Sequence, residues 1–217
     1  MEERAVKESL SLTTTRDKAS YSLGFHMGTT LRTQFADLDI VVFTQALRDA
    51  FNNYTPRLKS EEMQTILDAI QGEMMQKQKQ FIAKMADENK KSAEQFLEKN
   101  KTEKDIVALP NGLQYKVLTA GGREGASPTS FDSVIIHYQA AFLNGTIFES
   151  TYEEGQPKKI AVNQMIPGWS EALKMMHVGD KWQVFVPSYL AYGESGYPPV
   201  IGPNALLIFD IELLSIA

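Results

Sequence analysis

The sequence has no cysteine, which excludes disulfide bonds, a thiol nucleophile and cysteine-based metal sites. Histidine is also scarce: His26, His137 and His177 are far apart, and none has the carboxylate–histidine spacing of a metal site. Phosphate-binding loops, nucleophile elbows and Ser–His pairs are missing as well. We therefore expect no metal and no cofactor.

Long apolar runs and excess positive charge are absent too. No stretch of about 18 apolar residues occurs, so we expect no membrane-spanning segment. The formal net charge of −5 argues against nucleic acid or an anionic membrane as a partner. The N-terminus lacks the charged-then-apolar pattern of a signal sequence. We expect either a cytoplasmic protein or one whose leader has been removed.

The first third of the chain has the apolar period of helices. Residues 1–15 are polar and are expected to fray. A helix is predicted from Arg16 to about Phe35, and a second one, capped by Asp39, ends at Asn52. Their apolar faces are too small for an independent core. Burial against another copy of the chain would remove that difficulty.

A very long helix is predicted from about Ser60, as its N-cap, to about Thr102, since this stretch has no proline and one glycine. At 1.5 Å per residue it would be a rod of about 60 Å. Its first half has an apolar stripe, whereas residues 84–101 are polar nearly all round and should bridge through solvent. The rod is either a coiled coil or part of a homodimer in which the first helices and its apolar half interlock.

From residue 105 the apolar period changes from 3.6 to 2, which indicates strands. Asn144-Gly145 is a hairpin signal. A short helix enters at Pro167 and should continue through Met176 until Gly179 stops it. The predicted fold is an α+β domain, an antiparallel sheet wrapped on one short helix. Its strands are expected at residues 113–118, 133–143, 147–148, 160–162, 181–186 and 206–216.

Aromatic residues from distant parts of this domain are predicted to converge. Trp169 lies at the start of the short helix, facing the sheet, with its ring N–H as a possible donor. Tyr138, Phe148, Tyr192 and Phe209 are expected around it, in a pocket or in a plain core. Residues 188–203 form a long loop rich in glycine and proline, which favours a shaped, functional rim. His137 falls on the opposite face and is interpreted as a structural or surface histidine and not as a base.

Several motifs carry a resemblance to a known family. Residues 166–169 (Ile-Pro-Gly-Trp), 191–193 (Ala-Tyr-Gly) and 207–214 resemble the FKBP family of peptidyl-prolyl cis/trans isomerases. Residues 18–24, 86–90 and 112–116 resemble its longer bacterial members, the macrophage infectivity potentiator (Mip)-like proteins. The resemblance implies an N-terminal helical dimerisation domain (1–58), a long connecting helix (59–104) and an isomerase domain (105–217).

An aromatic, nearly uncharged pocket suits a reaction that makes no covalent bond. Rotation about an X–Pro amide has a barrier of about 18–20 kcal/mol because resonance stiffens the C–N bond. The twisted transition state loses that resonance and separates less charge than the planar amide, so an apolar site favours it over the ground state. Donors can then hold the carbonyl as it leaves the plane.

The resemblance also implies residue roles. Trp169 would be the floor beneath the prolyl ring, and the Tyr192 hydroxyl would donate to the substrate carbonyl. Glu149 stands where the family usually has aspartate, and Lys158 where some members have an aromatic wall, which puts the rate and macrolide affinity in question. The predicted catalytic residues are Tyr138, Glu149, Tyr192 and Phe209; the predicted substrate-binding residues are Phe148, Met165, Ile166, Trp169, Tyr197 and Ile201.

The resemblance implies partners and a location as well. Proline-containing polypeptides would be the substrates, macrolides such as tacrolimus or rapamycin would bind the pocket, and the chain would form a homodimer. The implied location is the periplasm or cell envelope of a Gram-negative bacterium, with the cytoplasm as the alternative. The alternative function is a dimeric folding chaperone, a holdase that uses the cleft between its arms, with the pocket only a proline anchor. A role in virulence follows from the subfamily's name alone.

Overall fold

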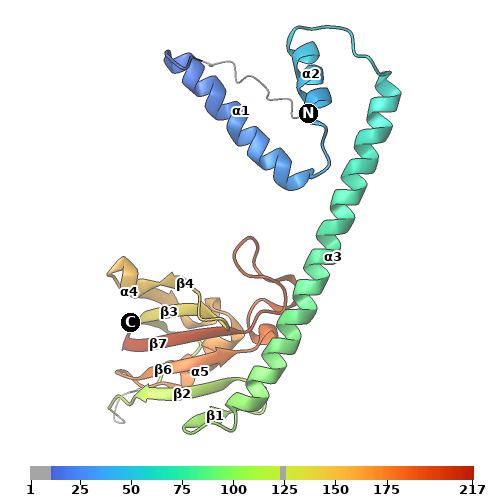
Figure 1. The fold of residues 1–217 in the computed structure, drawn as a ribbon. Helices are drawn as coiled ribbons and strands as arrows, with labels where there is room; N and C mark the ends of the chain where they lie inside the picture. Colours follow the sequence, from blue (N-terminus) through green and yellow to red (C-terminus); the bar gives the residue numbers. More distant parts are fainter. Residues whose placement is uncertain (1–10, 123–125) are drawn as a thin grey trace, which may run out of the picture. The chain divides into compact units, whose positions relative to one another are not determined.

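The computed structural model describes residues 11–122 and 126–217, so most of the segment expected to fray lies outside the described residues. The chain divides into two compact units, Met1–Ile70 and Gln71–Ala217. The order of elements along the chain can be followed in Figure 1.

The first unit contains α1 (Thr15–Gln34), α2 (Ile40–Phe51) and the start of α3 (Ser60–Asn100). Thr14 and Asp17 form a reciprocal capping box on α1. As predicted, the Asp39 side chain caps α2, accepting from the backbone N–H groups of Val41 and Val42, and Asn52 ends it. Neither α1 nor α2 has a buried residue in the single chain. The expectation that these helices make no core of their own is confirmed.

The long helix is confirmed, and α3 comprises 41 residues. Ser60 is its first helical residue and not its cap, because the N–H of Met63 already donates to the carbonyl of Lys59. The expectation that residues 84–101 are solvated on all sides is wrong. One stripe of this segment packs on the sheet domain, formed by Met85, Ala86, Asn89, Ala93, Phe96, Leu97 and Asn100.

Hydrogen bonds and small side chains explain why this contact is not visible as an apolar pattern. Asn100 Nδ2 donates to Gln114 Oε1 over 2.9 Å, and Gln114 Nε2 donates to the carbonyl of Leu97, also over 2.9 Å. Asn89 Nδ2 donates to the carbonyl of Pro203 over 2.8 Å. A stripe that uses asparagine and alanine resembles a solvated face in sequence, although it is a docking face.

The second unit contains a seven-stranded sheet in the order β1-β2-β6-β7-β3-β4, with β5 also paired to β3. Every pair is antiparallel. The predicted strands are confirmed to within a few residues, and β1 is an addition that was not predicted. The bounds are β1 Ile106–Ala108, β2 Gln114–Thr119, β3 Ser133–Phe142, β4 Ile147–Ser150, β5 Lys158–Ala161, β6 Lys181–Val186 and β7 Leu207–Ile216.

The edge beside β3 is split between two strands. Residues 133–136 of β3 pair with β5, whereas residues 139–141 pair with β4, so Tyr138 faces neither strand. Thr151, the first residue of the short helix α4 (Thr151–Glu154), lies at this gap. Its hydroxyl accepts from the Tyr138 N–H over 2.8 Å and donates to the Tyr138 carbonyl over 3.1 Å. One side chain thus replaces a missing strand partner.

The short helix α5 (Pro167–Met175) has Pro167 in its first turn, as predicted, and ends one residue before Met176, well short of Gly179. Gly168 permits its close approach to the sheet. A Cβ at this position would lie 2.5 Å from Val186 Cγ1 and 3.3 Å from Leu113 Cδ1. The helix can therefore place Trp169 directly against the strands.

The loop between β6 and β7 is shaped, as its composition suggested. It contains the 3₁₀ turns Ser188–Leu190 and Gly193–Ser195. Tyr197 and Ile201 bridge to each other through backbone hydrogen bonds of 2.8 and 2.9 Å, which close the tip of the loop. The predicted rim residues thus have defined positions.

Candidate active site

The deepest part of the candidate site is a contact of three aromatic rings from three elements. The Trp169 ring of α5 lies edge-on to Tyr138 of β3, with centroids 4.8 Å apart and planes at 79°. It meets Phe209 of β7 in the same manner, at 5.1 Å and 90°. Edge-to-face geometry is a favourable arrangement of such rings. The predicted convergence of these three aromatics is observed.

Trp169 is only 2% exposed and belongs to the hydrophobic core, as do Tyr138 and Phe209. The sequence left open whether these aromatics line a pocket or fill the core, and the structure places all three in the core. Among the described residues, the buried indole N–H of Trp169 has no hydrogen-bond partner. Exposed surface at the site belongs to the residues around the floor.

The ten predicted site residues lie at graded depths. Phe148 packs on Phe142, with ring centroids 4.6 Å apart. Tyr192 and Tyr197 lie with their rings 5.4 Å apart on the loop after β6. Tyr138, Trp169, Ile201 and Phe209 are buried, Phe148, Met165 and Ile166 are half-buried, and Glu149, Tyr192 and Tyr197 are exposed.

The Tyr138 hydroxyl donates to Glu149 Oε1, so the longer glutamate still makes this bond. Lys158 Nζ joins the pair, 3.0 Å from Glu149 Oε1 and 3.3 Å from the Tyr138 hydroxyl. Burial, together with the hydrogen bond to Glu149, raises the pKa of Tyr138 to about 12, although Lys158 opposes this. Burial by itself would raise the pKa of Glu149, but the hydrogen bonds from Tyr138 and Lys158 outweigh it and lower that pKa.

Tyr192 is 38% exposed. Burial raises its pKa, and the negative charge of Glu149 and the nearby Tyr197 act in the same direction. The phenol of Tyr192 therefore stays protonated at neutral pH and remains a hydrogen-bond donor, as the role predicted for it requires.

Two residues at the site have roles that sequence reasoning missed. Thr151 holds the backbone of Tyr138 but carries no motif, because its role arises from the break between β4 and β5. Lys158 was identified as a departure, but its pairing with Glu149 across nine residues was not foreseen. His137 contacts Thr151 Oγ1 through Nδ1 at 3.0 Å and stacks on Tyr152, in accord with its structural interpretation.

Residues 11–122 and 126–217 contain neither a candidate metal site nor a candidate membrane-spanning helix. No cluster of three or more histidine, cysteine, aspartate or glutamate side chains that could hold a metal ion occurs within these ranges. Over the same ranges, no helix is both long enough and apolar enough to cross a membrane.

Comparison with known proteins gives matches along most of the chain. The model described as the FKBP-type peptidyl-prolyl cis-trans isomerase matches residues 124–214. A second model, described as the domain amino terminal to FKBP-type peptidyl-prolyl isomerase, matches residues 16–117. The two matched regions, residues 16–117 and 124–214, together span most of the chain.

Similar proteins are found in several bacteria. The outer membrane protein MIP of Legionella longbeachae is 41% identical over 212 residues, which cover 98% of this chain and 90% of that protein. The peptidyl-prolyl cis-trans isomerase Mip of Coxiella burnetii is 40% identical over 94% of this chain and 88% of its own. The crystal structure of FkpA from Escherichia coli is 30% identical, with a TM-score of 0.75, over 95% of this chain and 98% of that one.

Proposed function

This chain belongs to the family of FKBP-type peptidyl-prolyl cis-trans isomerases and is an enzyme of that class, and we propose that its catalysis takes place on the aromatic cluster around Trp169. The observation that carries this assignment is the contact of three buried aromatic rings that come from β3, α5 and β7. Trp169 contacts Tyr138 and Phe209, and Tyr192 and Tyr197 lie exposed on the adjoining loop.

In the proposed mechanism, the prolyl ring of the substrate rests toward Trp169, with Phe209 and Tyr138 as walls. These side chains are apolar where they face the ring, so the planar amide is stabilised there less than it is in water. The twisted amide separates less charge, so it loses less stabilisation than the planar amide when it moves from water into this site. The free-energy difference between the two, which is the rotational barrier, therefore falls. The reaction needs no nucleophile and no proton transfer.

Tyr192 supplies the polar contact in this proposal. Its phenol is protonated and partly exposed, so it can donate to the carbonyl before the prolyl nitrogen. A donor positioned where the carbonyl lies in the twisted state lowers the barrier more than one that binds both states equally. Phe148, Met165 and Ile166 would complete the walls, and Tyr197 and Ile201 the rim.

Substitution of Tyr192 by phenylalanine tests this role. We expect Tyr192→Phe to lower kcat/KM for short X–Pro peptides, and Trp169→Leu or Phe209→Ala to lower it further. Tyr189→Phe is the matched control, because Tyr189 lies on the same loop and is 64% exposed, with its hydroxyl bonded to the carbonyl of Asn111. Equal activity of Tyr192→Phe, Trp169→Leu and the control would place the site elsewhere.

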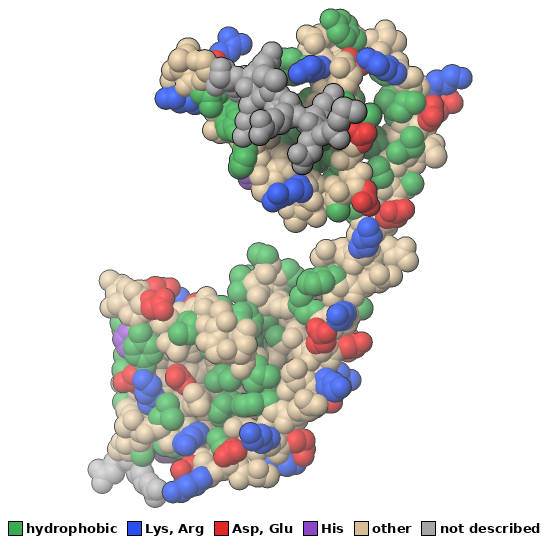
Figure 2. All heavy atoms as spheres, viewed as in Figure 1, with side chains coloured by type: hydrophobic (Ala, Val, Ile, Leu, Met, Phe, Trp, Pro, Cys, Tyr) green, Lys and Arg blue, Asp and Glu red, His purple; other side chains and the backbone are tan. Residues whose placement is uncertain are grey.

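We propose that the first unit forms a homodimer. In the single chain, apolar side chains of α1 and α2 are exposed, and Figure 2 shows hydrophobic side chains gathered on the surface of these helices. Phe25 is 67% exposed and Phe51 88%, so burial of this surface would be strongly favourable.

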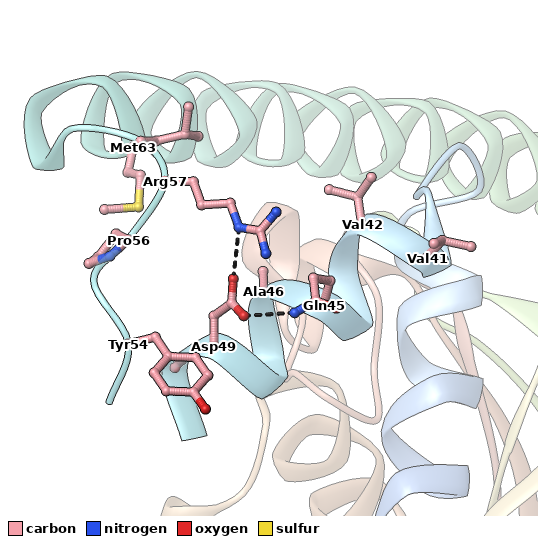
Figure 3. Close-up of a pocket in the computed structure, with 11 residues that line it drawn as sticks. Val41, Val42, Gln45, Ala46, Asp49, Tyr54, Pro56, Arg57 and Met63 are labelled. Carbon is pink, nitrogen blue, oxygen red and sulfur yellow. Dashed lines mark hydrogen bonds and ion pairs between the residues drawn. The ribbon is translucent and has the colours of Figure 1, made fainter. Parts of the chain in front are cut away.

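A cavity of about 630 Å³ in the same unit is a natural place for side chains of the partner. It is lined by apolar residues of α2 and of the segment leading into α3, with one polar cluster (Figure 3). In this cluster Asp49 pairs with Arg57 at 3.0 Å and accepts from Gln45 at 2.7 Å. The apolar lining includes Val41, Val42, Ala46, Tyr54, Leu58 and Met63.

Sedimentation of the purified chain tests the dimer. We expect a dimer for the natural sequence and a monomer for Val42→Glu, which places a charge in the apolar cavity. The same substitution at Val107, an exposed residue of β1, is the control and should leave the dimer intact. A monomeric natural chain, or a dimeric Val42→Glu variant, would contradict the proposal.

A chaperone activity alongside isomerisation is supported by exposed methionines, since methionine surfaces adapt to varied apolar partners. Met74 and Met75, which lie outside the first unit, are 39% and 54% exposed. In an aggregation assay, Tyr192→Phe should keep the suppression of aggregation while losing proline-limited refolding. Joint loss of both activities would contradict two separate functions.

Two finer assignments rest on the family. We propose that macrolides such as tacrolimus or rapamycin compete with substrate at Trp169, which titration of tryptophan fluorescence can test. The name of the Legionella longbeachae relative supports a location in the cell envelope, which fractionation of cells producing the full-length protein tests.

A further inference from the structure

Lys158 and Glu149, the two departures from the family pattern at this site, pair with each other. The ammonium group of Lys158 lies 3.0 Å from Glu149 Oε1 and 3.3 Å from the Tyr138 hydroxyl. It also lies 5.4 Å from the centre of the Tyr138 ring, within the range of a cation–π contact. The three side chains come from β5, β4 and β3, so the contact joins three strands.

The hydrogen bonds of Lys158 leave no donor for a substrate. A lysine ammonium has three N–H groups. Three acceptors lie within reach: Glu149, the Tyr138 hydroxyl and, at 3.5 Å, Glu154 Oε1. With two carboxylates beside it, the ammonium also presents no net positive charge to a passing peptide. Direct recognition of an acidic substrate is therefore disfavoured.

The position of Lys158 is fixed by the sheet. It is the first residue of β5 and pairs with Ile136 of β3, two residues before Tyr138. Glu149 pairs with Ala140, two residues after Tyr138. The two charged side chains thus reach Tyr138 from opposite directions along β3. Because Tyr138 lies at the gap between β4 and β5, the ion pair closes over it.

We propose that Lys158 is a positioning residue, which holds the Glu149 carboxylate on the Tyr138 hydroxyl and so keeps the Tyr138 ring edge-on to Trp169. This inference rests on the proposed site. A glutamate has one more rotatable bond than an aspartate, so its carboxylate loses more freedom when it makes this hydrogen bond. The second contact from Lys158 restricts that freedom.

The charges around Glu149 agree with this role. Lys158 and the Tyr138 hydroxyl stabilise its ionised form and lower its pKa against the effect of burial. Glu154 of α4 is the other carboxylate at the ammonium, and Tyr192 is the neighbouring group whose own pKa is raised in part by Glu149. In turn Glu149 and Tyr138 raise the pKa of Lys158, so the cation persists throughout the neutral range.

Lys158→Met tests the proposal, because methionine keeps the length of the stem and removes the charge. We expect kcat/KM to fall about two- to fivefold, the range for a partly exposed ion pair. The fall should be equal for peptides with Ala, Glu or Lys before proline. Lys158→Arg should recover most of the activity. Lys159→Met is the matched control, since the neighbouring Lys159 is exposed and pairs with Ile135 instead, and it should change nothing.

A double-mutant comparison shows whether Lys158 acts through Glu149. In a Glu149→Gln background, Lys158→Met should have no further effect on kcat/KM. An undiminished effect in that background, or one confined to peptides with an acidic residue before proline, would overturn the proposal in favour of direct substrate contact.

A readout independent of catalysis separates this inference from the proposed function. The pKa of the Glu149 carboxyl, measured by carbon NMR, should rise in Lys158→Met and stay unchanged in Lys159→Met. An unchanged Glu149 pKa in Lys158→Met would refute the positioning role. If the NMR shift occurs but Tyr192→Phe and Trp169→Leu retain full activity, the ion pair is as described and the site assignment fails.

Discussion

The hydroxyl of Thr151 provides the sharpest quantitative prediction. In an antiparallel strand, the N–H and C=O of one residue point to the same side. Both groups of Tyr138 therefore point into the gap between β4 and β5, where the Thr151 hydroxyl is bonded to each. Thr151 is fully buried. Thr151→Val keeps the shape of the side chain and removes the oxygen that bonds both of these groups.

The expected loss of stability follows from two buried groups left unpaired. Each costs about 1–3 kcal/mol, and relaxation should recover part of this, so we expect about 2–4 kcal/mol. Since the urea m-value of a small domain is about 1–3 kcal/mol/M, the unfolding midpoint should fall by about 1–2 M. Tryptophan fluorescence reports on this domain alone, because the two tryptophans, Trp169 and Trp182, belong to α5 and β6.

The control is Thr102→Val. Thr102 is exposed, and its hydroxyl donates to the carbonyl of Lys99 over 2.7 Å, so its loss should change stability by no more than about 0.5 kcal/mol. Thr151→Ser, which keeps the hydroxyl, should be more stable than Thr151→Val. Equal midpoints for Thr151→Val and Thr102→Val would refute the claim that this hydroxyl substitutes for a strand.

Three further predictions concern the packing of α5, the ionisation of Tyr138 and the removal of the first unit. Gly168→Ala should destabilise the domain by about 1–3 kcal/mol in urea unfolding because its Cβ would meet Val186, whereas Gly72→Ala, with open space around it, should not destabilise it. Tyr138 should ionise near pH 12 instead of 10. Its ionisation is obtained by subtracting the ultraviolet pH titration of Tyr138→Phe from that of the natural chain. Because the pKa of Tyr138 is higher in the folded than in the unfolded chain, its protonated phenol stabilises the fold fully below pH 10, and this contribution is lost as the pH rises through 12. Ionisation of Tyr138 at pH 10 would contradict its burial and its hydrogen bond to Glu149. Deletion of residues 1–80 should leave isomerisation of short peptides intact and weaken refolding of whole proteins, and loss of both would contradict the proposed division at residues 58 and 104.

Local features were readable from the sequence because they depend on neighbours along the chain. The cap at Asp39 and the turn at Asn144-Gly145 arise from contacts within a few residues. The alternation along residues 133–143 correctly indicated which side chains of β3 are buried. Motif resemblance added the family and the roles of the aromatic residues around Trp169, two of which, Tyr138 and Phe209, are in ring contact with it.

Only the tertiary structure decided which side chains meet across long separations. The docking stripe of α3 is hard to see as an apolar pattern because it contains Asn89 and Asn100, whose hydrogen-bond partners lie far along the chain in the sheet domain. The closure over Tyr138 by Thr151 and by the Lys158–Glu149 pair depends on the register of β3 with two separate strands. Periodicity records which face of an element is buried, but the partner of a buried or charged group is set by strand register, which no local pattern contains.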